Sequence, residues 1–262
     1  ASHWRDTSLL NATSVLSSGN LWSDENIDSM RRFYVDNLDE GDGNFITKFE
    51  GQLAPSPPET KQLAAEMMWF MLLCPSNIGQ QYKREFILGI WDWSNTPRPA
   101  LEPWLSDDVL RGIGSAGTAY NTSRWREIVY FVEFLQLFRA ESSSKKRELT
   151  NDGRKLAAWM GEFVPGSDHR QLRHMILFLL FPDDFTRIFG KSNRKKVIRS
   201  FTDLTRAQVA ALTALEGDKQ LNRFLEEAAE RHPGVELDFY EEPLKSIWQD
   251  TEPSAPAETQ SD

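Results

Sequence analysis

Residues 123–140 read SRWREIVYFVEFLQLFRA, and apolar side chains fall on almost every side of the helix that this stretch predicts. A helix that is hydrophobic all round must be surrounded by other elements, so a central buried helix is expected here. Strand signals are scarce, and the best of them, GVELDFY at 234–240, is short. The sequence therefore predicts a mainly α fold, a multi-helix globular domain with little or no β-sheet. Further helices are expected over several other segments: 23–39, 57–74, 80–94, 154–163, 169–181, 191–201, 206–215 and 218–232.

The composition indicates a globular chain with a sizeable core. Of 262 residues, 40% are hydrophobic, including nine Trp and 16 Phe. The formal net charge of −9 argues against general adhesion to nucleic acid, although it says little about a local basic patch. The single cysteine, Cys74, excludes an intrachain disulfide and a Cys-based zinc cluster, and it suits a reducing, cytoplasmic location. The longest apolar run, Met67–Cys74, is too short to span a membrane, and the polar first residues do not resemble a signal peptide.

Changes in composition divide the chain into parts. A polar break at 141–152 separates an N-terminal helical part, residues 1–140, from a C-terminal helical part, residues 153–248, which carries a basic helix. If the break is only a surface loop, the two parts form one compact domain. Residues 249–262 are rich in Pro, Ser and acids and are expected to form a disordered linker or tail.

Sequence motifs for catalysis are weak. The segment 112–117, GIGSAG, has the G-x-G-x-x-G spacing of a dinucleotide-binding turn, but the charged LSDDVLR before it does not predict the strand that such a turn requires. A P-loop ending at Lys191 would need a glycine where Phe185 stands. His169 and His174 would lie about 140° apart on a helix, which is poor for a shared metal. We therefore expect a non-enzymatic chain without catalytic residues, metal or cofactor.

A local concentration of positive charge is the first candidate for a binding site. Between Arg170 and Arg206 there are nine Arg or Lys and only three acids. Such charge separation can mark a phosphate-binding face, although an ordinary solvated helix face is an equal alternative. Val197, Ile198 and Phe201 are expected to face the core, which would leave the basic side chains largely outward. The candidate phosphate contacts on this helix are Lys191, Arg194, Lys195, Lys196 and Arg199.

The second candidate is the glycine-rich segment and the residues that follow it. Three glycines could let the chain approach a ligand closely, and polar side chains stand just before the helix that starts near Arg124. Free N–H groups at a helix N-terminus favour anions. The structural alternative is a glycine C-cap followed by an N-cap from Thr122 or Ser123. The candidate nucleic-acid contacts here are Arg124, Tyr120 and Asn121.

Taken together, these segments resemble the N-terminal region of McrB-type AAA+ ATPases from prokaryotic, type IV-like restriction and defence systems. The resemblance lies in KQLAAEMMWFMLLCPSNIG, GIGSAGTAYNTSRWREIVYF, RQLRHMILFLLFPDDFTRIFGKSNRKKVIRSF and DFYEEPLKSIW, and covers most of residues 60–248. It implies an AAA+ motor in the same full-length chain and a separate nuclease subunit as partner. N-terminal regions in this family commonly act as recognition modules, often for modified DNA.

The expected function is that of a non-catalytic targeting module of a restriction-type defence ATPase. It would bind nucleic acid, with DNA favoured, through the basic helix and the glycine-rich loop; Lys and Arg would supply affinity, and Tyr120 and Asn121 any selectivity. The alternative is a protein-interaction or oligomerisation domain that docks a partner subunit or senses a phage protein. The acidic net charge favours the alternative, whereas the charge separation favours the first function.

Overall fold

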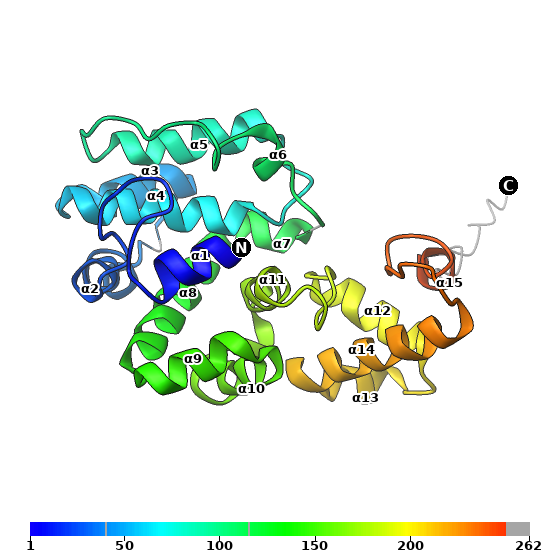
Figure 1. Ribbon diagram of the computed structural model, residues 1–262. Helices are drawn as coiled ribbons and strands as arrows, with labels where there is room; N and C mark the ends of the chain where they lie inside the picture. Colours follow the sequence, from blue (N-terminus) through cyan, green and yellow to red (C-terminus); the bar gives the residue numbers. More distant parts are fainter. Residues whose placement is uncertain (40, 115, 250–262) are drawn as a thin grey trace, which may run out of the picture. The chain divides into compact units, whose positions relative to one another are not determined.

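The chain is built from helices (Figure 1). The computed structural model describes residues 1–39, 41–114 and 116–249. Helices account for 64% of the chain, about twice the share in an ordinary globular protein. Within the described residues the β-structure is an isolated parallel bridge between Pro75 and Gly114, and residues 235–238 are irregular. The prediction of a mainly α fold is confirmed.

The helices belong to two compact units, Ala1–Lys191 and one that begins at Ser192. The first unit contains α1 Ser2–Trp4, η1 Arg5–Leu9, α2 Asp24–Phe33, η2 Val35–Asn37, α3 Phe45–Leu53, α4 Pro58–Leu72, α5 Gln80–Asp92, α6 Asp107–Leu110, α7 Gly117–Thr122, α8 Arg124–Ala140, α9 Ser143–Asn151, α10 Gly153–Phe163, η3 Ser167–His169 and α11 Gln171–Leu180. The second contains α12 Lys191–Phe201, whose first residue still belongs to the first unit, α13 Arg206–Ala211, α14 Ala214–Arg231 and α15 Lys245–Gln249.

Local signals explain where several helices begin. The Ser23 side chain accepts a hydrogen bond from the backbone N–H of Asn26 and caps α2. Pro58 occupies the first turn of α4, where a missing N–H costs nothing. Thr213 and Glu216 form a reciprocal capping box at the start of α14. The starts of α2 and α4 were predicted at these residues, whereas the helices predicted at 206–215 and 218–232 do not match the start of α14 at Ala214.

The predicted break at 141–152 is helical. Ser142 caps α9 by accepting from the N–H of Lys145, and Asp152 caps α10 by accepting from the N–H of Lys155. The boundary between the compact units instead follows Lys191. The predicted division into 1–140 and 153–248 stays a prediction. Of the predicted linker 249–262, Gln249 is the last residue of α15 (Lys245–Gln249), and residues 250–262 lie outside the described residues. No helix in the described ranges is long and apolar enough to cross a membrane.

The core of the first unit is aromatic and centres on α4 and α8. Figure 1 shows α4 beside α5, and these two helices are in contact along their length. The ring of Trp4 lies 4.0 Å from that of Phe70 on α4, and Phe70 lies 5.4 Å from Phe131 on α8. Trp22 packs on both Trp4 and Phe131, at 5.5 and 5.8 Å. The predicted central position of 123–140 matches the full burial of Phe131 and its neighbours on α8.

A buried carboxylate fastens the N-terminal segment to this core. Glu66 on α4 is fully buried. It accepts hydrogen bonds from Ser14 Oγ at 2.5 Å, Val15 N at 2.5 Å and Trp22 Nε1 at 2.8 Å. Burial raises the pKa of Glu66, and these donors act in the opposite direction. A single side chain on α4 therefore satisfies three donors of residues 14–22.

A buried lysine on α5 contacts the C-terminal end of α6. The Lys83 side chain is fully buried on α5 and donates from Nζ to the carbonyl oxygen of Leu110 at 2.7 Å. Burial lowers the pKa of Lys83 to about 8, from an ordinary value of 10.5. Burial likewise raises the pKa of the nearby Cys74 thiol, so Cys74 is a protonated core residue.

The pKa of Lys83 predicts a pH dependence of stability. Between pH 8 and 10.5 the unfolded chain binds this proton and the folded chain does not, so the contribution of Lys83 to the free energy of unfolding rises with pH. The gain across this window is about 3 kcal/mol at 1.36 kcal/mol per pKa unit. Urea unfolding of the parent and of Lys83→Met measures this gain. The two measurements are made at about pH 7.5, just below the window, and at about pH 10.5, its upper end. An unfolding free-energy difference between the two proteins that is independent of pH would contradict the assignment.

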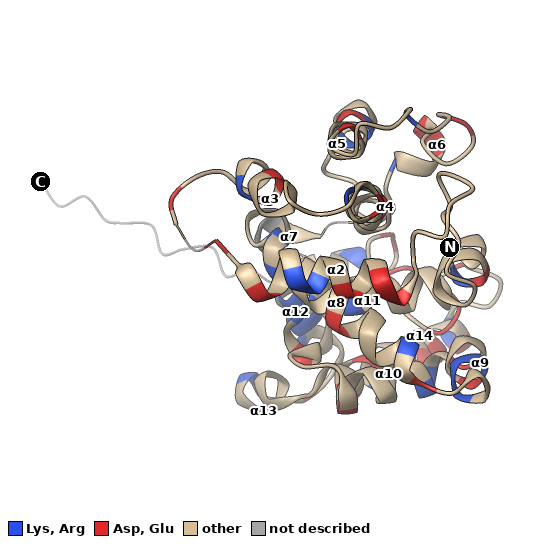
Figure 2. Cartoon of the chain, turned by 90° about the vertical axis from the view of Figure 1, so that its left-hand side faces the viewer, with Lys and Arg blue, Asp and Glu red and all other residues tan. Residues whose placement is uncertain are grey.

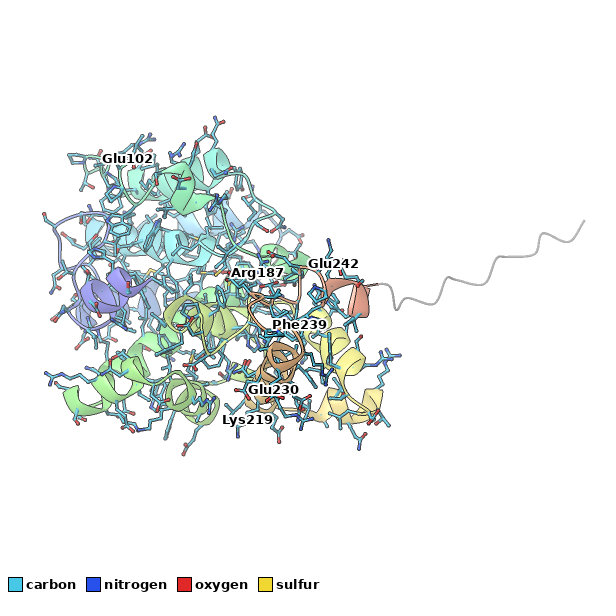
Figure 3. The ribbon with its side chains drawn as sticks, turned by 45° about the vertical axis from the view of Figure 1, so that its right-hand side comes forward. Glu102, Arg187, Lys219, Glu230, Phe239 and Glu242 are labelled. Carbon is cyan, nitrogen blue, oxygen red and sulfur yellow. The ribbon has the colours of Figure 1, made fainter. Side chains whose placement is uncertain are left out.

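The second unit is held by aromatic contacts and one ion pair. Phe201 at the end of α12 packs on Phe224 of α14 at 5.6 Å and on Phe239 at 5.5 Å; Figure 3 labels Phe239. Val197 and Ile198 are buried, so the expected core-facing side of α12 is confirmed. Because Val197 and Ile198 face the core, only cations on the other sides of α12 reach solvent.

Candidate nucleic-acid interface

Three cations of α12 remain accessible in the second unit, and Figure 2 colours the basic residues of the chain blue. Arg199 is exposed, and Lys195 and Lys196 are partly exposed. Residues 195 and 199 are one helical turn apart, as are 196 and 199, so the three side chains share one side of the helix. We call Lys195, Lys196 and Arg199 the basic face. Residues 191–201 contain no acid.

Arg194 does not belong to this face. The expectation that it points outward is wrong, because its side chain is buried and pairs with Asp218 of α14. Arg194 is directly before Lys195 in sequence, but a 100° turn of the helix places it towards α14. Its charge is therefore neutralised within the second unit.

Lys191 lies at the boundary and is bonded within the first unit. Its Nζ is 3.1 Å from Nδ1 of His169, and both side chains are at the surface. The side chain of Lys191 is exposed, as that of Arg199 is, but Lys191 is hydrogen-bonded to His169. Within the described part of the chain neither Lys195 nor Arg199 makes a hydrogen bond or an ion pair.

The glycine-rich segment packs closely against the end of α4. Gly112 has a φ of +81°, and a Cβ there would lie 2.3 Å from the carbonyl oxygen of Pro75, so a side chain is excluded. The N–H groups of Ile113 and Gly114 donate to the carbonyl oxygen of Cys74 at 2.9 and 3.0 Å. Gly112 ends the short helix α6 as the expected C-cap glycine, and the described chain places no strand before it. Close backbone packing thus explains Gly112 and Gly114 without a ligand.

The expected cap before α8 is only partly present. Ser123 occupies the N-cap position of α8, but its side chain makes no capping hydrogen bond. Of the predicted selectivity residues, Tyr120 is 1% exposed and donates its hydroxyl to the carbonyl oxygen of Met71 at 2.9 Å. The Tyr120 side chain is thus a core residue, and its predicted contact with a base is not compatible with this position. The side chain of Asn121 lies outside the described residues.

Arg124 occupies an unusual environment for a cation. It is 8% exposed, and its guanidinium carbon lies 4.9 Å from the centroid of Phe86 and 5.6 Å from that of Phe45. Its Nε has no hydrogen-bond partner, and no carboxylate in the described ranges pairs with it. Burial lowers the pKa of Arg124, yet an arginine stays charged at neutral pH. Its positive charge is held by aromatic faces and is not neutralised by an acid.

A pocket next to Arg124 was not predicted from the sequence. It has a volume of about 510 Å³ and lies where α3 meets the start of α8. Trp125 and Arg126 form one side of it, and Phe45 and Lys48 of α3 another. The sequence does carry one signal for an accessible site here, because an arginine stands on each side of Trp125. The apolar run that follows led us to place this tryptophan in the buried helix instead. The complete lining is Tyr34, Leu38, Asp39, Gly43, Phe45, Lys48, Gln52, Thr122, Trp125 and Arg126.

Apart from Lys191, which is bonded to His169, and Asn121, whose side chain is not described, the predicted site residues fall in three groups. The structure brings together Lys195, Lys196 and Arg199 on the second unit, and it buries Arg194 and Tyr120. Arg124 lies in the first unit beside the pocket. Within the described residues no cluster of His, Cys, Asp and Glu could hold a metal ion. No protein family matches the sequence, and neither a curated protein nor a solved structure is similar to the chain.

Proposed function

We propose that the chain is a non-catalytic nucleic-acid-binding module whose basic face contacts phosphates. The observation that carries the proposal is the arrangement of Lys195, Lys196 and Arg199 on one side of α12, in a stretch without acids. Adjacent turns of a helix are 5.4 Å apart, so cations one turn apart on the same face lie close enough together to contact neighbouring phosphates. The unpaired state of Lys195 and Arg199 among the described residues leaves their charges available to a ligand.

The restriction-type context belongs to the same proposal and rests on the resemblance to McrB-type ATPases. In this context the module works in the cytoplasm, joined to an AAA+ motor in the full-length chain and assisted by a separate nuclease subunit. Phosphate contacts carry no base identity, so the basic face supplies affinity and leaves sequence selection to other residues. DNA is the favoured ligand.

The salt dependence of binding tests the proposal. Substitution of all three basic-face residues by Ala is expected to lower the slope of log K against log salt by roughly 2–3 units, because each lost contact no longer releases a counterion. The slope is measured by fluorescence anisotropy with a labelled oligonucleotide, and the loss of affinity should be equal for unrelated sequences. Arg194 is left in place because its loss would disturb the fold.

The matched control is a triple alanine variant at exposed cations outside α12. Arg223, Arg231 and Lys245 serve this purpose, since they lie on α14 and α15 of the same unit. Their removal changes the net charge equally and should alter the slope little. An equal effect of both variants would show a general charge effect and overturn the basic face. If the parent binds no nucleic acid at low salt, the proposal falls and the protein-interaction function takes its place.

A further inference from the structure

We infer that the pocket where α3 meets α8 binds one nucleotide of a single-stranded nucleic acid, with the base against Trp125 and the phosphate near Arg126. The inference rests on the proposed function and names the form of nucleic acid that the first unit accepts. It concerns residues of the first unit alone. The pocket offers one exposed aromatic ring, an accessible arginine and a volume that suits one nucleotide.

The aromatic surface is Trp125. Its side chain is 39% exposed, although most large apolar residues of the first unit are buried. The guanidinium carbon of Arg126 lies 5.0 Å from the Trp125 ring, so one side of the indole is already in contact with a cation. Single-strand-binding proteins use this combination, an exposed aromatic ring beside arginine, because every base has a face that can stack.

The positive charge of Arg126 favours an anionic ligand. The side chain of Arg126 is exposed and lines the pocket, so its guanidinium is accessible to a ligand there. Arg124 is buried against Phe45 and Phe86 and is not among the lining residues, so it does not contact the ligand directly. The phosphate is therefore assigned to Arg126.

The remaining lining fits a base edge better than a second phosphate. Asp39 lines the pocket with a side chain that is 48% exposed, and it pairs with Lys48 at 3.8 Å. A carboxylate repels phosphate but accepts hydrogen bonds from the exocyclic amino group of a base. The Asp39 side of the pocket is therefore suited to the base, and the Arg126 side to the backbone.

The dimensions of the pocket favour a single strand over a duplex. A volume of about 510 Å³ lies within the usual range for sites that take one small molecule, and a nucleotide is such a ligand. In a duplex the base faces are stacked on each other and are not available to an indole. A single strand offers both an open base face and a phosphate.

Oligonucleotides with and without bases test the inference directly. The probes are a ten-residue single-stranded DNA (about the span of one small binding domain), an abasic strand of equal length, and a duplex of the same sequence. The parent is expected to bind the base-containing strand roughly 10- to 100-fold more tightly than the abasic strand, which has the same phosphates. Trp125→Ala should abolish this ratio, and Trp125→Phe should retain most of it.

Two controls separate stacking from folding and from general charge. Phe163→Ala removes another exposed aromatic ring, on α10, and should leave the ratio unchanged. Thermal melting shows whether each variant is folded. Arg126→Ala should weaken binding of both strands, because it removes a phosphate contact.

The outcomes distinguish this inference from the proposed function. If the parent binds the abasic strand as tightly as the base-containing single strand, the pocket does not take a base, whereas the basic face stands if its triple variant still lowers the salt slope. If folded Trp125→Ala keeps the parent's ratio, the inference is likewise wrong. If no nucleic acid binds at all, both the inference and the proposed function are wrong.

Discussion

Glu66→Ala is expected to destabilise the protein by about 5 kcal/mol, a large part of the stability of a typical domain. The substitution leaves Ser14 Oγ, Val15 N and Trp22 Nε1 buried without their acceptor. Each unsatisfied donor costs about 1–3 kcal/mol, and water has little access to this interior. Urea unfolding followed by circular dichroism measures the loss, and hydrogen exchange should show that residues 8–22 lose protection first.

Two further variants define the cause of this effect. Glu162→Ala removes an exposed glutamate from α10 and should change the unfolding free energy by no more than about 0.5 kcal/mol. Glu66→Gln keeps one acceptor oxygen but introduces an amide N–H among donors, so an intermediate loss is expected. Equal stability of Glu66→Ala and the parent would show that the three hydrogen bonds contribute nothing.

Arg194→Ala is expected to cost about 4 kcal/mol, because it leaves Asp218 as a buried charge without its partner. Asp218→Ala should cost a similar amount. The double variant Arg194→Met, Asp218→Leu removes both charges and fills the space, so it should recover most of the loss. Hydrogen exchange of α12 and α14 in the full chain reports this local stability.

Arg199→Ala provides the comparison on the same helix. Arg199 is exposed and, among the described residues, unpaired, so its removal should leave exchange rates of α12 almost unchanged. A loss of less than about 0.5 kcal/mol for Arg194→Ala, similar to that of an ordinary surface substitution, would contradict the structural role of the ion pair. Such a result would return Arg194 to the candidate phosphate contacts.

The fold could be predicted largely from local signals. Continuous apolar runs and capping residues indicated α2, α4, α8 and α14, because a helix depends mainly on its own sequence and on one buried side. Residues 45–53 carried no predicted helix, although Phe45, Phe49 and Leu53 follow a four-residue spacing after a capping asparagine. The polar α9 was also missed, since its burial depends on α10.

The candidate site was less predictable, because it depends on contacts between distant segments. Nothing near Arg194 in the sequence indicates Asp218, which lies 24 residues later and neutralises it. Tyr120 looked polar and accessible, but its acceptor, Met71, is on α4, 49 residues earlier. The pocket beside Trp125 requires α3, which was not predicted, and so could not be inferred. Charge pattern alone identified Lys195, Lys196 and Arg199 as candidates.

The dependence of residues 8–22 on Glu66 and Phe131 has a consequence for synthesis. The chain is made from its N-terminus, at about 5–20 residues per second, so Trp22 is added to the chain roughly 5–20 s before Phe131. The donors of residues 14 and 15 have no acceptor until Glu66 is added, and the indole of Trp22 lacks its contact with Phe131 throughout this interval. The first segment to be made is therefore among the last to become native, and a chaperone that binds exposed aromatic side chains should recognise it on nascent chains that end before α8.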